Sequence, residues 1–276
     1  MTVAFAGDVI IVTGAGRGIG RGYALLAADR GARVVVNDYG GDLQGTPGDA
    51  SCAEAVVAEI RRAGGTAIAD ATDVAAADAG ERIVDAALRA WGRIDGIVNN
   101  AGVTRGGMGI EQNSDDDFLV AFQVHTMGSA RLARAAWRHM KQARHGRIVN
   151  TSSDAVWGMP GGAYIAAKAA NLGLTRALAA EGRRYGVLVN AVSPCAVTRM
   201  SPPSATGDQE RVDRYLTAAG VAPLVVSLLR RECAVTGRAF QAGGNRAAET
   251  GILQRHHWHG EWNYTIHPAP DPKTQT

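Results

Sequence analysis

The chain has 276 residues, of which 46% are hydrophobic and 20% charged, a composition that excludes a disordered or collagen-like protein. Lysine and arginine number 29 against 26 acidic residues and are scattered, so we expect no nucleic-acid interface and no basic membrane-binding patch. The cysteines, Cys52, Cys195 and Cys233, form no C-x-x-C pair, which favours a reducing compartment and predicts neither a disulfide framework nor a metal site. No leader pattern is visible in the first eight residues and no apolar run approaches about 18 residues, so we expect a cytoplasmic protein without a membrane span.

Short apolar runs alternate with segments of helical periodicity along most of the chain. The runs that predict buried strands are 9–12, 34–36, 67–69, 97–98, 148–149 and 187–189, and the segments that predict helices are 53–63, 79–91, 118–142 and 164–185. This alternation predicts an α/β fold, a single-domain doubly wound parallel sheet of the Rossmann type with helices on both faces. Ligands should then bind at the carboxyl ends of the strands.

The chain changes character near Ser201. Residues 201–207 are rich in serine, proline and glycine, and a helical pattern at 221–231 leads to a last predicted strand at 237–240. From 256 to 276 the sequence is polar, with interspersed aromatic residues and prolines. We therefore expect one domain over residues 1–250 and a C-terminal arm over 251–276.

A glycine-rich turn follows the first predicted strand. It reads Thr13-Gly-Ala-Gly-Arg-Gly-Ile-Gly20 and leads into a helical segment. This order of strand, turn and helix suits a dinucleotide, because glycines let backbone amides approach a pyrophosphate at the positive end of a helix. Gly18 would allow that approach and Gly20 the packing of helix on strand. The alternative is a tight turn without a ligand.

Asp38 ends the second predicted strand, 18 residues after Gly20. An acidic side chain at this distance can accept hydrogen bonds from both hydroxyl groups of an adenosine ribose, and it would repel a 2′-phosphate. The position therefore predicts NAD as the cofactor, and Arg17 could offset the repulsion only in part. The alternative is that Asp38 begins a turn with Gly40 and Gly41.

Tyr164 and Lys168 are four residues apart and share one face of the predicted helix. A lysine ammonium close to a phenol stabilises the phenolate, which makes tyrosine a usable proton donor and acceptor near neutral pH. Taken alone, the pair would be interpreted as two surface residues of a helix.

The ordered motifs, completed by Asn99-Asn100-Ala101-Gly102, Ser152-Ser153 and the run 194–198, resemble the short-chain dehydrogenase/reductase family over about residues 5–250. The resemblance implies that Tyr164 is the catalytic acid and base, that Lys168 lowers the pKa of Tyr164 and binds the ribose, and that a serine holds the substrate oxygen. It implies NAD-binding positions at Gly14, Gly16, Arg17, Gly18, Ile19, Gly20, Asp38, Asp73, Val74, Asn100, Ala101, Gly102, Tyr164, Lys168, Pro194, Val197 and Thr198.

Three positions depart from the usual pattern or leave a choice. Counting from the strand favours Ser153 as the catalytic serine, although the spacing to Tyr164 is a residue or two shorter than usual; Ser152 would then be a turn or helix-cap residue. His125 stands where most members carry asparagine, and its backbone carbonyl is expected to hold a water leading toward Lys168, so we include it in the catalytic set. Cys195 replaces the usual glycine after Pro194 and is interpreted as a packing residue.

A closer resemblance comes from Asn37-Asp38, the insertion at 43–50, Val124-His125 and Thr198-Arg199-Met200, which are similar to the (3R)-hydroxyacyl-CoA dehydrogenase domain of multifunctional β-oxidation enzymes. That branch uses NAD, and some relatives act on 17-hydroxysteroids. We therefore expect NAD-dependent oxidation of a secondary alcohol similar to a 3-hydroxyacyl-CoA. A hydroxysteroid or small secondary alcohol is the alternative within the family. An NADPH-dependent ketoreductase and a non-catalytic dinucleotide sensor are the other hypotheses.

The apolar faces of the helices predicted between 118 and 140 and between 163 and 178 exceed what one sheet face needs. Together with the resemblance, this excess predicts a homodimer or homotetramer. Residues 1–250 would form the NAD-binding short-chain dehydrogenase domain, including the catalytic site.

Overall fold

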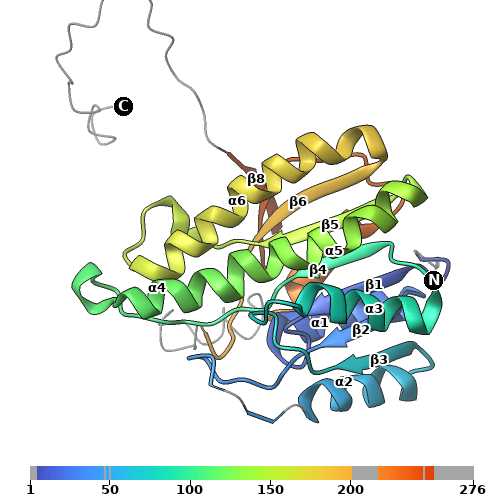
Figure 1. Ribbon diagram of the computed structural model, residues 1–276, viewed down its shortest axis with the longest axis horizontal. Coiled ribbons are helices and arrows are strands. Elements are labelled where there is room, and N and C mark those ends of the chain that lie inside the picture. The colour runs from blue at the N-terminus through green and yellow to red at the C-terminus, as the bar shows by residue number, and fades with distance from the viewer. Residues whose placement is uncertain (1–4, 47, 50, 201–216, 245, 252–276) are drawn as a thin grey trace, which may run out of the picture.

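The computed structural model describes residues 5–46, 48–49, 51–200, 217–244 and 246–251. Within these ranges the chain forms a sheet of eight strands in the order β3-β2-β1-β4-β5-β6-β7-β8, covered by helices on both faces (Figure 1). The strands are β1 (Val9–Thr13), β2 (Arg33–Asn37), β3 (Thr66–Asp70), β4 (Gly96–Asn99), β5 (Gly146–Thr151), β6 (Val187–Pro194), β7 (Ala239–Gly243) and β8 (Arg246–Thr250). Neighbours from β3 to β7 pair in parallel, and β8 pairs antiparallel to β7. The predicted α/β fold is confirmed.

The helices connect the parallel strands as crossovers. They are α1 (Gly18–Asp29), α2 (Ser51–Arg62), α3 (Ala79–Trp91), α4 (Asp115–Ala121), α5 (Gly128–Ala143), α6 (Gly162–Gly182) and α8 (Ala222–Leu229), with a π-helical turn η2 (Phe122–Met127) and short 3-10 turns η1 (Ile110–Gln112), η3 (Asp154–Trp157), η4 (Arg183–Tyr185) and η6 (Ala218–Val221). Every helix in the described ranges is too short or too polar to cross a membrane.

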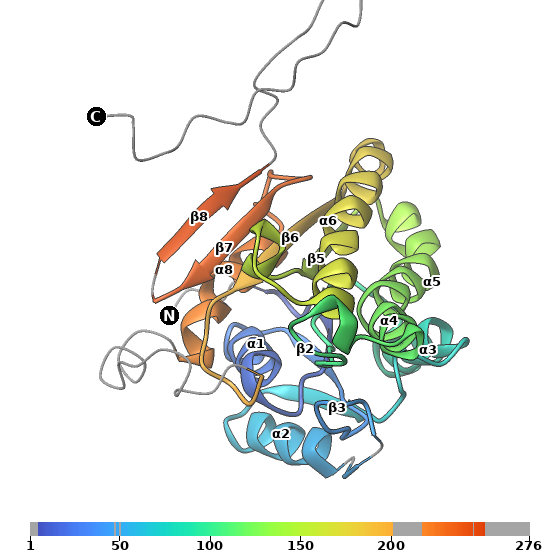
Figure 2. The same ribbon diagram turned by 90° about the vertical axis from the view of Figure 1, so that its left-hand side faces the viewer.

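The two faces of the sheet carry separate apolar cores. Along β1, Ile10 and Val12 pack with residues of α1, α2 and α8, whereas Val9 and Ile11 pack with residues of α3, α5 and α6. Figure 2 shows α1 and α8 on one side of the sheet and α5 and α6 on the other. Because every residue of β1 is buried, the strand is apolar throughout rather than alternating.

The strand order reverses beside β1. From β1 the chain proceeds outward to β2 and β3, then crosses to β4 on the other side of β1, where Ile11 lies opposite Ile97. The connections after β1 and β4 therefore leave in opposite directions at their carboxyl ends. In an open parallel sheet this point leaves a crevice in which ligands bind.

Two elements differ from the expectations. The helix predicted over 118–142 is a continuous helical segment made of α4, η2 and α5, and its middle is π-helical, a variation that apolar periodicity does not reveal. The last predicted strand begins at Ala239 and is followed by β8, which was not predicted because its residues Arg246 to Glu249 are exposed and show no apolar alternation. The expected arm over 251–276, except for Gly251, and the segment 201–216 lie outside the described residues.

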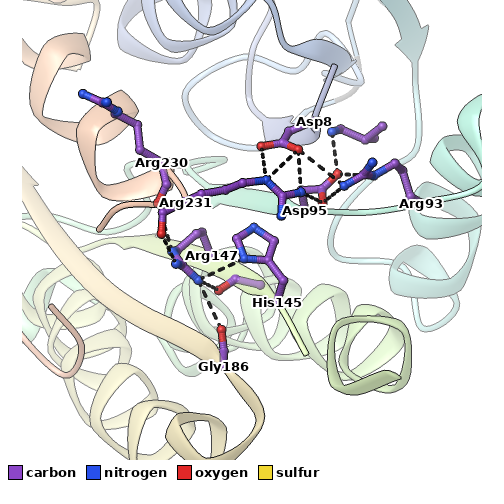
Figure 3. A network of polar contacts seen from close by, with 10 residues as sticks. Asp8, Arg93, Asp95, His145, Arg147, Gly186, Arg230 and Arg231 are labelled. Atoms are coloured by element: carbon purple, nitrogen blue, oxygen red, sulfur yellow. Dashed lines mark hydrogen bonds and ion pairs between the residues drawn. The ribbon is translucent and has the colours of Figure 1, made fainter. Parts of the chain in front are cut away.

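A polar network covers the amino-terminal edge of the sheet. Asp8 and Asp95 are almost fully buried, and Arg231 lies between them, with Nη2 2.7 Å from Asp8 Oδ1 and 3.2 Å from Asp95 Oδ1 (Figure 3). Arg93 adds a second pair, 2.6 Å from Asp95. Nearby, the buried guanidinium of Arg147 donates to the backbone carbonyls of Gly146, Gly186, Arg230, Arg231 and Cys233. These contacts fasten the segment after α8 to the sheet.

Candidate active site

A cavity of about 790 Å³ opens at the carboxyl ends of the strands, next to the reversal beside β1. Its lining comes from the glycine turn and from the segments after β2, β3, β4, β5 and β6, together with the start of α6. All of the predicted site residues line it except Gly16, which donates to Asp38, and His125, whose ring contacts Tyr164. Among the described residues, no three histidine, cysteine or acidic side chains gather where they could hold a metal ion.

The glycine turn is shaped by contacts that exclude larger side chains. Gly14 and Gly18 have φ angles of +62° and +54°, a region that favours glycine. A Cβ on Gly20 would lie 2.1 Å from the Gly14 carbonyl oxygen, so α1 packs directly on the turn. Arg17 precedes α1 without capping it by its side chain. Because the first amides of a helix need a partner, the turn fits the phosphates of a dinucleotide.

Asp38 is held by the backbone on two sides. Its Oδ2 accepts a hydrogen bond from Gly16 N at 2.9 Å, and its Oδ1 accepts one from Gly40 N at 2.8 Å. The turn expected as the alternative is therefore present, and it fixes the carboxylate at the cavity wall. Each carboxylate oxygen can accept a further hydrogen bond, so the turn and the ribose role are compatible.

The segment after β4 is fixed against the first strand. Thr13 Oγ1 accepts hydrogen bonds from the backbone amides of Asn100 and Ala101, at 3.0 and 3.1 Å. The Asn100 side chain donates to the carbonyls of Thr13 and Gly14. A Cβ on Gly102 would lie 2.6 Å from His125 Cε1, so the imidazole supports this segment from behind.

The structure distinguishes the two candidate serines. Ser152 is buried, and its Oγ donates to the Lys168 carbonyl at 2.9 Å. Ser153 lines the cavity and forms a hydrogen bond with Tyr164, and its Oγ also accepts from Ala155 N at 3.2 Å. The geometry favours Ser153 as the residue that holds a substrate oxygen.

Lys168 is buried below Tyr164. Its Nζ donates to the Thr151 carbonyl at 3.3 Å and lies 5.7 Å from the centre of the Tyr164 ring. Burial lowers the pKa of Lys168 to about 7. Burial also raises the pKa of Tyr164, against a hydrogen bond from Ser153 that lowers it. Lys168 is not among the causes of the Tyr164 shift, and the lowering of the Tyr164 pKa by Lys168 stays a prediction.

His125 is buried in the π-helical turn, and the structure shows what its ring does. Nε2 lies 2.9 Å from the Val103 carbonyl oxygen, and the ring meets Tyr164 edge-on with 5.4 Å between centres. Its backbone carbonyl accepts a hydrogen bond from Ser129 Oγ at 2.6 Å. Burial, then the nearby Lys168 charge, hold the His125 pKa well below its usual value. The water relay through the carbonyl stays a prediction; the support that the ring gives to Tyr164 was not predicted.

The segment after β6 closes the cavity from the other side. Pro194, Val197 and Thr198 line it, and Thr198 Cγ2 lies 3.8 Å from the Cβ position of Gly18. Cys195 lines the cavity and is exposed, and its Cβ would lie 2.8 Å from a Cβ on Gly243, so its role as a packing residue stays a prediction. The sequence missed this exposure because the glycine normally found there gives no guide to where a larger side chain would go.

The cavity mouth carries large apolar side chains that were not predicted. Met108 and Met159 line the cavity and are each 58% exposed, and Met200 is 37% exposed. Trp157 is exposed in η3, two residues before Met159. An exposed group of this kind marks a surface that contacts an apolar ligand or partner.

Comparisons with known proteins agree with this geometry. The model of the family described as short chain dehydrogenase matches residues 8–208. The chain is 45% identical over 241 residues to the peroxisomal multifunctional enzyme type 2 of Mus musculus, covering 87% of this chain and 32% of that protein. It is 40% identical over 251 residues to a short-chain type dehydrogenase/reductase of Mycobacterium tuberculosis, covering 89% of this chain and 85% of that one. The crystal structure of a short chain dehydrogenase from Mycobacterium avium superposes with a TM-score of 0.81 at 38% identity, covering 99% of this chain and 92% of that one.

The chain spans about a third of the length of the multifunctional relatives it matches. The similarity to them therefore concerns one part of a longer protein, and the activities of the whole relatives do not transfer to this chain directly.

Proposed function

Because the chain belongs to the short-chain dehydrogenase family and is an oxidoreductase acting on CH–OH groups, we propose that it moves a hydride between a secondary alcohol carbon and NAD+. The observation that carries this proposal is the placement of Ser153, Tyr164 and Lys168 in one cavity with Asp38 and the glycine turn. A proton acceptor, an oxygen anchor and a dinucleotide cradle are thus brought to the same crevice.

The roles of the side chains follow from their contacts. Ser153, hydrogen-bonded to Tyr164, holds the substrate oxygen, and Tyr164 takes the hydroxyl proton as the alcohol is oxidised. Lys168, whose pKa is about 7, exchanges a proton in the range in which Tyr164 must give and take one. The bound nicotinamide supplies the hydride acceptor. The buried ring of His125 supports Tyr164 edge-on.

The choice of NAD rests on Asp38. Its carboxylate is fixed by Gly16 N and Gly40 N at the place where the glycine turn would receive an adenosine ribose. A 2′-phosphate would bring negative charge against this carboxylate, so the NADPH-dependent alternative is disfavoured.

The substrate we propose is a 3-hydroxyacyl thioester similar to a 3-hydroxyacyl-CoA. Met108, Met159 and Met200 give the mouth an adaptable apolar surface suited to an acyl chain, because methionine side chains are flexible and polarisable. The same surface also favours a hydroxysteroid as a second candidate.

We propose the cytoplasm as the location of the protein. We also propose that it assembles as a homodimer or homotetramer. Leu119 on α4 is 63% exposed and Met127 at the end of η2 is 39% exposed, so this helical surface carries apolar groups suited to a second copy.

The test is an initial-rate panel of 3-hydroxyacyl-CoAs, hydroxysteroids and simple secondary alcohols, each with NAD+ and NADP+. Preference for an acyl-CoA with NAD+ supports the proposal. Turnover of steroids or small alcohols alone would keep the chemistry and replace the substrate. No turnover despite tight NADH binding would favour the dinucleotide sensor.

A further inference from the structure

Two arginines from distant parts of the chain meet at one carbonyl oxygen on the cavity rim. Arg17 Nη1 lies 3.5 Å from the Gly41 oxygen, and Arg199 Nη1 lies 3.2 Å from the same oxygen. Arg17 belongs to the glycine turn before α1, and Arg199 follows Thr198 in the segment after β6. All three residues line the cavity, so the two side chains approach each other across it.

Neither arginine is neutralised by an ion pair within the described part of the chain, where no carboxylate lies at ion-pairing distance from either. Arg105 lines the same cavity but pairs with Asp116 and Asp117. Two like charges at one neutral oxygen repel each other, and a guanidinium has five donors of which this oxygen uses one. The arrangement therefore suits an anion that both arginines can reach.

The neighbouring groups indicate which anion fits. The N-terminus of α1 has no side-chain cap. Thr198 lies next to Gly18, the first residue of α1. Arg199 also lies near Tyr39, which follows the end of β2. Burial, then the charges of Asp73, Asp42 and Asp38, raise the pKa of Tyr39, and the charge of Arg199 lowers it. A dinucleotide whose ribose reaches Asp38 would place its diphosphate at the N-terminus of α1. The diphosphate would then lie between Thr198 on one side and the end of β2 on the other.

We propose that Arg199 and Arg17 form a phosphate clasp for the diphosphate of the dinucleotide. Before the ligand binds, both guanidinium groups are hydrogen-bonded to the Gly41 carbonyl; on binding, they donate to phosphate oxygens at the N-terminus of α1. The clasp rests on the proposed function, since it takes the dinucleotide as its ligand. The phosphates of a CoA substrate have the same chemistry, and the experiment separates the two sources.

The experiment measures dissociation constants on the full chain without any turnover, using NADH, ADP-ribose and adenosine. Arg199→Ala should weaken NADH and ADP-ribose about tenfold, because a charge-assisted hydrogen bond to phosphate is lost, and should leave adenosine unchanged. Arg199→Lys should recover part of the loss. Arg105→Ala is the matched control and should bind ADP-ribose as the wild type does, because that arginine is already neutralised.

Three outcomes would overturn the clasp, and they differ from one another. Wild-type affinity of Arg199→Ala for ADP-ribose would refute it while leaving the proposed function intact. If Arg199→Ala binds ADP-ribose and pantetheine as the wild type does but binds free coenzyme A more weakly, the arginines hold the phosphates of the substrate instead. No binding of NADH or ADP-ribose by the wild type would refute the proposed function together with the clasp.

Discussion

The two edges of the sheet differ in whether their buried charged groups have a partner of opposite charge. At the amino-terminal edge, Asp8 and Asp95 are buried but paired with Arg93 and Arg231, as Figure 3 shows. At the carboxyl edge, the ammonium of Lys168 is buried and donates to the Thr151 carbonyl, and this burial lowers its pKa. At the first edge the buried carboxylates are paired, so breaking a pair costs stability, whereas the second edge keeps a desolvated, titratable group that costs stability and can exchange protons.

The largest expected effect is at the carboxyl edge. Tyr164→Phe should lower kcat roughly 10³-fold, because the acid and base is lost while the ring remains against His125. NADH affinity and the free energy of unfolding should stay close to wild type. Initial rates, cofactor titration and urea denaturation on the same preparation check this. Near-normal turnover would show that Tyr164 does not carry the proton.

The matching substitution at the amino-terminal edge should lower the free energy of unfolding and leave kcat unchanged. Asp95→Ala removes one acceptor of Arg93 and one of Arg231, which keep Asp8, and it removes the acceptor of Val9 N, which donates to Asp95 Oδ2 at 2.8 Å. The two arginines are about half exposed and can be rehydrated, so we expect a loss of about 2–4 kcal/mol, chiefly from the buried Val9 amide left without an acceptor and from the weakened ion pairs.

Urea denaturation gives the loss of stability, and kcat at 25 °C should be unchanged. Asp95→Asn is the control, because it keeps an acceptor for Val9 N and should lose less. A large fall in kcat of the folded Asp95→Ala variant would contradict the division between the edges.

Cofactor choice should respond to Asp38 on a smaller scale. Asp38→Asn keeps the size of the side chain and an acceptor for a backbone amide but removes the charge, so the ratio of kcat/KM for NAD+ to that for NADP+ should fall roughly tenfold or more. Parallel kinetics with both cofactors measure the ratio. An unchanged ratio would mean that the carboxylate only builds the turn with Gly40.

The sequence predicted more of the backbone than of the electrostatics. Buried parallel strands such as Val9–Thr13 are continuous apolar runs, and the glycine turn can be found because its steric demands at Gly18 and Gly20 permit little else. By contrast β8 carries no pattern, because all but its last residue are exposed. Motif spacing also brought most of the site residues to the right cavity.

What the sequence did not predict depends on packing between distant segments. The contact that buries Ser152, from its hydroxyl to the Lys168 carbonyl, is one example, although counting from the strand had favoured Ser153 as the catalytic serine. The π-helical turn around His125 is another, because apolar periodicity does not distinguish it from an α-helix. The lowered pKa of Lys168 depends on how completely neighbouring elements exclude water, and no spacing rule contains that information.

The most direct test of the division between the edges is the pH dependence of unfolding in Lys168→Met. The folded-state pKa of Lys168 is about 7, below its usual 10.5, so the unfolded state binds the proton more tightly. The cost of burying Lys168, measured as lost free energy of unfolding, is therefore largest below about pH 7 and disappears as pH rises toward 10.5. Between these two pH values the stability of the wild type rises with pH because of this group. Lys141→Met, a partly exposed lysine of α5, is the matched control.

We predict that Lys168→Met is more stable than wild type at pH 7, on the order of 1 kcal/mol, that it lacks this part of the rise with pH, and that its kcat falls at least about 100-fold. Lys141→Met should change neither the slope nor the rate. A less stable Lys168→Met variant with the wild-type pH slope would contradict the account, because Lys168 would then stabilise the fold as a charged group in the same way as the arginines of the opposite edge.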